Sequence, residues 1–236
     1  MKNKRMRIRA MLMAAIGAVS VSPPTLWAVT VPFTEDFASD AANWRDGVGT
    51  SLLEWHADDG PDRGSFVSGR QSFGSLSAGA FAILYRAQED FGSSGGAFQG
   101  SWVADDVTEI RYLVRQHTGV PLTFFTRFRG PGPGFVPAAA VLEPVSVASD
   151  TWTEISVPLP SAGMIFEGPF SFDQVFGNIG RLQVGVVVPP GLAGNTESFA
   201  FDLDKVAIVP EPATWALLTI GAVAGLRRRL RGVRGT

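Results

Sequence analysis

The sequence contains no cysteine among its 236 residues. It therefore has no disulfide framework, no thiolate metal site and no cysteine nucleophile. Histidine is nearly as scarce, because the chain has only His56 and His117, and each stands alone in its stretch of sequence. Neither has a second ligand at the spacing of a metal-binding pair. These absences leave little reactive chemistry, so we expect a non-enzymatic protein.

Charge is unevenly spread along the chain. Residues 1–28 carry five basic residues and no acid, and residues 226–236 carry five arginines and no acid. Residues 29–209 hold ten Lys and Arg against 21 Asp and Glu, a formal charge of −11. Because binding of nucleic acid requires a basic surface, this acidic body argues against a nucleic-acid partner. Its carboxylates are ligands of the kind that calcium prefers.

The N-terminal segment, residues 1–28, is organised as a secretory signal peptide. Its basic residues precede an apolar stretch from Ala10 to about Val21, and polar and proline residues follow up to Ala28, a small residue suited to cleavage. We expect a signal helix that passes through the Sec translocon and is then removed.

A second apolar segment, residues 213–226, contains no charged residue. As a helix it would cover about 21 Å, which is short of the roughly 30 Å of a bilayer core, so it would span a membrane only marginally. The arginines that follow it stay on the cytoplasmic side. Both ends of the chain therefore place the acidic body outside the inner membrane.

The C-terminal tail resembles a PEP-CTERM sorting signal. It combines a Pro-Glu-Pro triplet, a short hydrophobic helix that crosses the inner membrane transiently, and an arginine cluster. The residues that carry the resemblance are Pro210, Glu211, Pro212, Arg227, Arg228 and Arg229. The resemblance implies recognition by an exosortase, cleavage near the triplet, and release or re-anchoring at the cell surface or in the extracellular matrix. We therefore expect a signal peptide at 1–28, a body at 29–209 and a sorting signal at 210–234.

The body alternates apolar and polar residues, as half-buried strands do. The clearest runs are 108–115, 121–128, 181–188 and 198–206, and shorter candidates are 52–57, 65–69, 80–87 and 151–159. Turns rich in Gly and Pro separate these runs, and one short helical turn is expected within 172–180. The pattern predicts an all-β fold, an antiparallel β-sandwich of the jelly-roll type.

Three stretches of the body, FTEDFASDAANW, TWTEISVPL and FDLDKVAI, resemble jelly rolls of the carbohydrate-binding-module type or their laminin-B-like variant. The stretch WHADDGPDRGSFVSG is similar to the WxxxGGPDGGSFV segments of bacterial surface proteins, but it has Asp58 and Asp59 where a glycine pair is expected. The resemblance implies the same sandwich that the periodicity predicts.

Two acidic groups are candidates for a structural calcium ion. The first and last strands of a jelly roll commonly lie close together, which would bring together Glu35, Asp36, Asp202 and Asp204. The resemblance implies a structural calcium in this region. A second candidate is the loop that contains Asp58, Asp59 and Asp62. The alternative is that these acids are solvated or cap turns.

A sugar-binding surface would need an exposed aromatic ring, because the apolar face of a pyranose packs on it. Of the four tryptophans in the body, Trp152 shares strand parity with Glu154, so alternation would expose it, and Trp102 follows a glycine-rich segment. These two are the predicted ligand-binding residues, ahead of Trp44 and Trp55. Two arginines beside an aromatic residue could line the same groove: Arg127 and Arg129, beside Phe125.

The function that fits these features best is that of an exported cell-surface or biofilm-matrix protein that contacts exopolysaccharide. The alternatives are an adhesin or matrix protein that binds other proteins, and a glycoside hydrolase or lyase that uses paired carboxylates.

Overall fold

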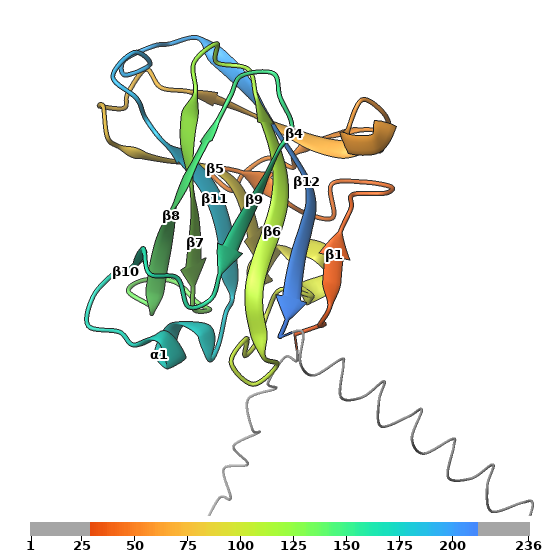
Figure 1. Ribbon diagram of the computed structural model, residues 1–236, viewed down its shortest axis with the longest axis vertical. Coiled ribbons are helices and arrows are strands. Elements are labelled where there is room, and N and C mark those ends of the chain that lie inside the picture. Colours follow the sequence, from red (N-terminus) through yellow and green to blue (C-terminus); the bar gives the residue numbers. More distant parts are fainter. Residues whose placement is uncertain (1–28, 212–236) are drawn as a thin grey trace, which may run out of the picture.

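The structure is a computed structural model that describes residues 29–211 (Figure 1). The expected signal helix, the apolar segment 213–226, Pro212 and the arginine cluster at 227–229 lie outside the described residues. Within the described part, no helix has the length and apolar character needed to cross a membrane.

The described residues form two antiparallel sheets. In sheet A the strands run in the order β3 (Glu54–His56), β4 (Phe66–Ser72), β12 (Ser198–Pro210), β6 (Val107–Gln116) and β9 (Thr153–Pro158), and β1 (Phe33–Glu35) also pairs with β12. In sheet B the order is β10 (Met164–Phe166), β8 (Ala138–Val147), β7 (Leu122–Arg129), β11 (Arg181–Val187), β5 (Phe81–Gln88) and β2 (Arg45–Asp46). The predicted all-β antiparallel sandwich is confirmed.

Helical structure within the described range is limited to short segments. Three are 3-10 turns, η1 (Pro61–Arg63), η2 (Glu89–Phe91) and η3 (Ser93–Gly96). The fourth is α1 (Phe172–Phe176), which falls within the predicted helical turn. It starts at a capping box in which Ser171 and Gln174 satisfy each other's backbone N–H groups.

The core lies between the two sheets and follows the alternation of the sequence. On β6 the side chains of Ile110, Tyr112 and Val114 are buried, and on β11 so are those of Leu182 and Val184. Burial of each large apolar side chain stabilises the fold by about 1.5–3 kcal/mol before the entropy of ordering is counted. The largest fully buried side chains include Trp44, Trp102, Phe124, Phe128, Phe176 and Phe201.

Strand β8 has no counterpart among the predicted strands. Its sequence, AAAVLEPVSV, starts with three alanines and contains a proline, both of which are depleted in strands. The structure explains the alanines by their neighbours on β7. The opposed pairs are Ala138 with Arg129, Ala139 with Phe128 and Ala140 with Arg127. Small residues on β8 therefore leave room for large side chains on its neighbour.

One buried carboxyl interrupts the apolar core. Glu143, on β8, points between the sheets and is 3% exposed, and one of its oxygens has no hydrogen-bond partner within the described range. Burial raises the pKa of Glu143 to about 7. The hydroxyl of Tyr112, from sheet A, is also buried and bonds to the Thr126 hydroxyl at 2.7 Å. The core is therefore sensitive to pH.

Both ends of the described chain lie at the same end of the sandwich (Figure 1). The backbone N–H of Val29 donates to the carboxylate of Asp105 at 3.2 Å. The backbone N–H of Glu211 donates to the carbonyl of Asp106 at 3.1 Å. Two consecutive residues therefore hold the first and last described residues of the body.

Candidate functional site

The outer face of sheet B carries rows of side chains that cross four or five strands. Directly opposed residues of antiparallel strands share a face, so the strand register gives the members of each row. One row consists of Arg45, Arg86, Gln183, Arg127 and Ala140. The next consists of Gln88, Arg181, Arg129 and Ala138, and on the other side lie Ile83, Gly185, Phe125 and Leu142.

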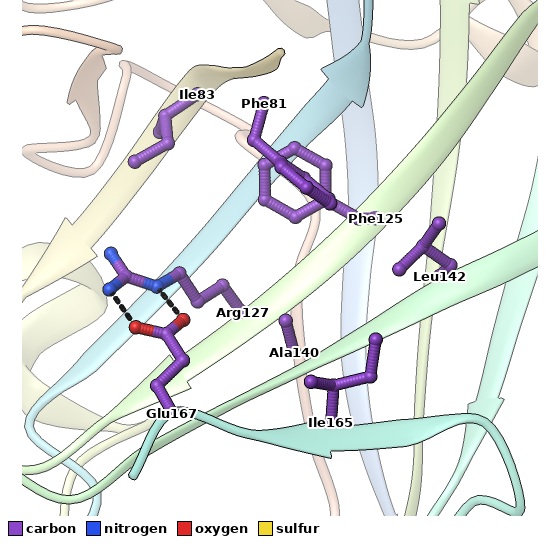
Figure 2. Close-up of a pocket in the computed structure, with 8 residues that line it drawn as sticks. All are labelled: Phe81, Ile83, Phe125, Arg127, Ala140, Leu142, Ile165 and Glu167. Carbon is purple, nitrogen blue, oxygen red and sulfur yellow. Dashed lines mark hydrogen bonds and ion pairs between the residues drawn. The ribbon is translucent and has the colours of Figure 1, made fainter. Parts of the chain in front are cut away.

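A groove of about 430 Å³ lies on this face (Figure 2). Its lining consists of Phe81, Ile83, Phe125, Arg127, Ala140, Leu142, Ile165 and Glu167. Phe125 forms part of the floor, and Phe81 meets it edge to face with 5.0 Å between ring centroids. Phe81 and Ile165 are 53% and 55% exposed. The groove is therefore apolar and open, with charged groups at one end.

A glycine under the groove allows the Phe125 ring to lie against the sheet. A Cβ at Gly185 would stand 2.5 Å from the Phe125 ring and 2.3 Å from the carbonyl oxygen of Ala82. Any larger residue would push the ring outward and fill the groove. The hollow therefore depends on the absence of a side chain on the central strand β11.

The charged end of the groove is an ion pair between Arg127 and Glu167 (Figure 2). Two guanidinium nitrogens of Arg127, Nε and Nη2, donate to the two carboxylate oxygens of Glu167. The third nitrogen, Nη1, donates to the Gln183 amide oxygen at 3.0 Å. This two-pronged geometry is the one that guanidinium and carboxylate groups favour. It offers a sugar both donors and acceptors beside an apolar surface.

Five arginines gather on this face, and we call them the arginine patch: Arg45, Arg86, Arg127, Arg129 and Arg181. They are half of the ten Lys and Arg residues in the body. Burial lowers the pKa of Arg86, and its arginine neighbours lower it further. Burial and the charges of Arg127 and Arg181 lower the pKa of Arg129 in the same way. The arginines are therefore close enough to repel one another.

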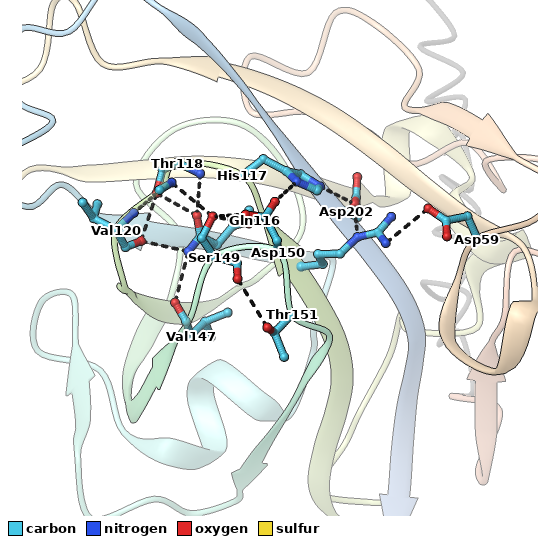
Figure 3. Close-up of polar contacts among 12 residues, drawn as sticks. Asp59, Gln116, His117, Thr118, Val120, Val147, Ser149, Asp150, Thr151 and Asp202 are labelled. Atoms are coloured by element: carbon cyan, nitrogen blue, oxygen red, sulfur yellow. Dashed lines mark hydrogen bonds and ion pairs between the residues drawn. The ribbon is translucent and has the colours of Figure 1, made fainter.

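The outer face of sheet A also carries charges, but these are paired (Figure 3). The buried carboxylate of Asp202 accepts from Arg115 Nε at 2.7 Å and from His117 Nε2 at 3.0 Å. Arg115 also reaches Asp59 at 3.3 Å, and His117 Nδ1 bonds to Asp150 at 2.5 Å. Burial lowers the pKa of His117, but the hydrogen bonds to Asp202 and Asp150 outweigh this, and the net shift is upward.

An aromatic cluster beside these charges contains Trp152. Its ring meets Phe66 edge to face, with 5.6 Å between centroids, and Phe66 stacks on His56 at 4.5 Å. The Arg115 guanidinium lies 4.8 Å from the Trp152 centroid and covers part of the ring. Trp152 is half-buried, whereas strand parity alone would expose it, and its role in ligand binding stays a prediction.

Of the other three tryptophans in the body, two are buried and one is exposed. Trp102 is 1% exposed and packs in the core against Phe128, and its indole N–H donates to the Phe98 carbonyl at 2.9 Å. Trp102, a predicted ligand-binding residue, therefore lies in the core and not on the surface. Trp44 is also buried, whereas Trp55, on β3 of sheet A, is 38% exposed.

The predicted calcium ligands do not form one cluster. The strands that carry them do adjoin, since Glu35 lies opposite Val206. However, Asp202 is held by Arg115 and His117, and within residues 29–211 no three His, Asp or Glu side chains are placed to hold one metal ion. Asp202 is therefore engaged with basic side chains, and calcium binding by the predicted set stays a prediction.

The remaining predicted ligands, Asp36 and Asp204, lie with Asp62 around Lys205. The Lys205 ammonium bonds to Asp62 at 2.6 Å. Burial raises the pKa of Asp204 to about 6, and the charges of Asp36 and Asp62 raise it further while Lys205 lowers it. One lysine cation therefore offsets part of the charge of three neighbouring carboxyl groups. Asp58 and Asp59 lie in the loop between β3 and β4, and calcium binding there stays a prediction.

Two groups of the kind used in nucleophilic catalysis, His117 and Ser94, are engaged in other contacts. Both nitrogens of His117 bond to carboxylates rather than to a hydroxyl. Residues 92–96 have the spacing GxSxG, but the hydroxyl of Ser94 accepts from the Trp44 indole N–H at 2.8 Å. No hydrogen bond in the described range joins a serine or threonine hydroxyl to a histidine.

The sorting triplet begins inside the fold. Pro210 is buried and is the last residue of β12, where it lies opposite Val107. Glu211 is exposed immediately beyond it. The predicted cleavage region is therefore separated from the sandwich by no linker.

Comparison with known proteins supports the reading of this tail. Residues 209–229 match the PEP-CTERM protein-sorting motif. The predicted sorting signal is therefore confirmed. No curated protein matches the chain.

Solved structures with similar folds are distant in sequence. The family 11 carbohydrate-binding module of cellulase Lic26A-Cel5E of Clostridium thermocellum has 12% identity and a TM-score of 0.46, covering 78% of this chain and 97% of that one. The CBM22-1 xylan-binding domain of Paenibacillus barcinonensis Xyn10C has 14% identity and a TM-score of 0.44, covering 76% and 94%. The CBM22-1–GH10 modules of xylanase 10B of Clostridium thermocellum have 14% identity and a TM-score of 0.45, and there the match covers 75% of this chain but only 28% of that one.

Proposed function

We propose that this chain is an exported, non-enzymatic protein that binds polysaccharide in the groove on the outer face of sheet B. The groove is the observation that carries the proposal. It joins an exposed aromatic ring, Phe81, to an ordered pair of hydrogen-bonding groups, Arg127 and Glu167. Sugars offer the matching chemistry, with apolar ring faces and hydroxyls that both donate and accept.

The position of the groove suits a chain-like ligand. It lies on a broad sheet face, and its walls come from β5, β7, β8 and β10. Strands hold their side chains at fixed spacing, so the binding groups are in place before the ligand arrives. A long polymer can therefore lie across the strands without entering a closed cavity.

The sorting motif supports the cellular part of the proposal. A PEP-CTERM tail implies a precursor that is exported, held by its tail and cut by an exosortase at the outer side of the inner membrane. The mature body would then be a cell-surface or matrix protein, where exopolysaccharide is the abundant polymer. Glu211, exposed at the end of β12, marks the place where the body meets the tail.

The experiment is affinity electrophoresis of the purified full chain, kept in mild detergent, in gels that contain a panel of neutral and acidic polysaccharides. We expect at least one polymer to retard it. Phe81→Ala removes the exposed ring and should weaken binding on the order of tenfold, because an aromatic contact of this kind contributes about 1.5 kcal/mol.

Trp152→Ala is the matched control, because it removes an aromatic ring from the opposite face. It should leave retardation unchanged if the groove is the site. Loss of binding in Trp152→Ala with full binding in Phe81→Ala would move the site to sheet A. No retardation by any polymer in the panel would overturn the proposed function, and mass spectrometry of the exported form would test cleavage beside Glu211.

A further inference from the structure

The arginine patch extends beyond the groove and is not explained by the fold. Of its members only Arg127 lines the groove, while Arg86 and Arg129 continue the face on either side. The four acids at the edges of the patch are Asp46, Glu89, Asp90 and Glu167, and they leave it at a formal charge of about +1 in a body of −11. A cationic area on so acidic a body indicates an anionic partner.

Two members of the patch oppose each other directly. Arg129 on β7 and Arg181 on β11 are register partners. Like charges at directly opposed positions destabilise a sheet. Arg181 approaches Asp90 at 3.4 Å, whereas the terminal nitrogen of Arg129 reaches only the carbonyl of Gly134, at 3.0 Å. Arg181 therefore has acidic neighbours in Glu89 and Asp90, whereas Arg129 forms no salt bridge within the described residues.

Unused hydrogen-bond donors lie on the same sheet face. Among the described residues, the buried Nε–H groups of Arg45, Arg129 and Arg181 have no acceptor, and neither does the side-chain amide nitrogen of Gln183. A buried donor without an acceptor destabilises the fold. Arg45 lies apart on the edge strand β2, but the other three donors come from the adjacent strands β7 and β11, and a ligand rich in acceptors would satisfy them once these side chains turn toward it.

Arg127 shows which kind of acceptor suits an arginine on this face. Its Nε and Nη2 hold the carboxylate of Glu167 in a two-pronged pair. Arg129 lies two residues further along the same strand, on the same face, with the same side chain and no such partner. A guanidinium matches a planar carboxylate closely, so a second carboxylate is the natural ligand for the Arg129–Arg181 pair once their Nε–H edges turn toward it.

The spacing between the rows of side chains on sheet B indicates that a ligand carboxylate at Arg129 and Arg181 can belong to the same polymer as a sugar ring in the groove. Phe125, Arg127 and Arg129 alternate along β7, so successive rows lie about 6–7 Å apart. A sugar packed on Phe81 and Phe125 has its ring over the apolar row. Its neighbours along the polymer lie over the arginines, where a charged substituent meets the unpaired donors.

We propose that the polymer bound by this groove is an acidic polysaccharide built from uronic acids, whose carboxylates are held by Arg129 and Arg181. This inference rests on the proposed function and names its ligand class. It excludes neutral glucans, xylans and mannans as the preferred ligands, because these have no group to fill the Arg129–Arg181 site.

The test uses the full chain and polymers that differ only in charge. Binding to polygalacturonate, alginate and hyaluronate is measured by affinity electrophoresis, together with polygalacturonate whose carboxyl groups have been reduced to alcohols. We expect retardation by at least one uronic-acid polymer, a loss on the order of tenfold when the carboxyl groups are removed, and weaker binding as salt rises.

Arg129→Gln should reproduce that loss on the charged polymer and change nothing on the reduced one. Arg70→Gln is the matched control, because Arg70 is exposed on the outer face of sheet A and the substitution removes the same charge. This variant should bind as the parent protein does. Thermal melts of both variants establish that they are folded.

The outcomes separate the two proposals. Equal binding to charged and reduced polymers, weakened by Phe81→Ala but not by Arg129→Gln, overturns the uronic-acid inference and leaves the proposed function standing. Equal loss in Arg129→Gln and Arg70→Gln shows that net charge alone drives binding, which also overturns it. Binding to no polymer overturns both.

Discussion

The two outer faces of the sandwich use the same kinds of side chain in opposite ways. Sheet A places Arg115 between the carboxylates of Asp202 and Asp59 and over the Trp152 ring. Sheet B places Arg129 opposite Arg181, and each has a buried Nε–H without an acceptor in the described range. Both faces thus combine aromatic, basic and acidic groups. Sheet A also has a buried donor without an acceptor in the described range, the Trp152 indole N–H, so the two faces differ mainly in how their arginines are paired.

This difference favours the outer face of sheet B as the binding face. A side chain that is already paired and stacked must lose those contacts before it can hold a ligand, whereas an unpaired one gains contacts from it. We therefore interpret the charges of sheet A as part of the stability of the fold and those of sheet B as a binding surface.

The strongest way to break this comparison is to remove the central arginine of sheet A. Arg115→Gln leaves the buried Asp202 carboxylate with His117 alone and uncovers Trp152. We expect a loss on the order of 3–5 kcal/mol in the free energy of unfolding, because one partner of a buried ion pair is left behind. Urea denaturation measures it. Arg111→Gln is the control, since Arg111 is exposed and pairs with Glu109, and it should cost about 1 kcal/mol or less.

The core between the two faces should respond to pH through Glu143. Its pKa is about 7 when folded and near the ordinary 4.5 when unfolded, so the folded state binds more protons between these values. Stability is then greatest below about pH 4.5 on this account and falls as pH rises to about 7. Glu143→Gln should remove that slope and add up to about 3 kcal/mol at pH 8. Urea melts across pH measure it, and an unchanged slope would contradict it.

An arginine-to-glutamine substitution on sheet B should change the free energy of unfolding in the opposite direction to Arg115→Gln. Arg129→Gln relieves the repulsion with Arg181, so we expect stability to stay level or to rise by about 0.5–1 kcal/mol. The measurement is urea denaturation beside Arg115→Gln under the same buffer. A loss as large as that of Arg115→Gln would show that the patch is structural rather than a binding surface.

The smallest expected effect is that of calcium. Arg115 and His117 already bond to Asp202, and Lys205 bonds to Asp62 within the acidic group that also includes Asp36 and Asp204. We therefore expect thermal melts in millimolar calcium and in chelator to differ by about 1 °C or less, where 1 kcal/mol corresponds to roughly 2–4 °C in a domain of this size. A larger increase with calcium, abolished by Asp36→Asn, would support the calcium prediction instead.

The strands were predictable wherever one face is apolar and the other polar. The run 181–188 contains β11, and 108–115 lies within β6, because burial of Leu182 or Ile110 leaves a period of two in the sequence. The two-residue β2 has too little length to show any period. Strand β8 shows no period of two at its start, because its three alanines lie opposite large side chains of β7.

The candidate site was predictable only in part. Phe125, Arg127 and Arg129 stand on one strand, so their shared neighbourhood was visible in the sequence. Phe81, Ile165 and Arg181 come from three other strands, and only the register brings them to the same face. Glu167 is 40 residues from the arginine that it pairs with, and nothing in the local sequence marks the pair.

The hold on the two ends of the body has a mechanical consequence. Val29 and Glu211 are bonded to the consecutive residues Asp105 and Asp106, and β12 runs the height of the sandwich to reach that point. A body joined to a membrane at this end of the sandwich is attached at one point. The loops at the other end lie about 40 Å from that point, because the 13 residues of β12 span about this height. An enzyme that cuts beside Glu211 would therefore contact the folded sandwich directly. Its active site would have to accommodate the sandwich, or the last residues of β12 would have to unpair from the sheet first.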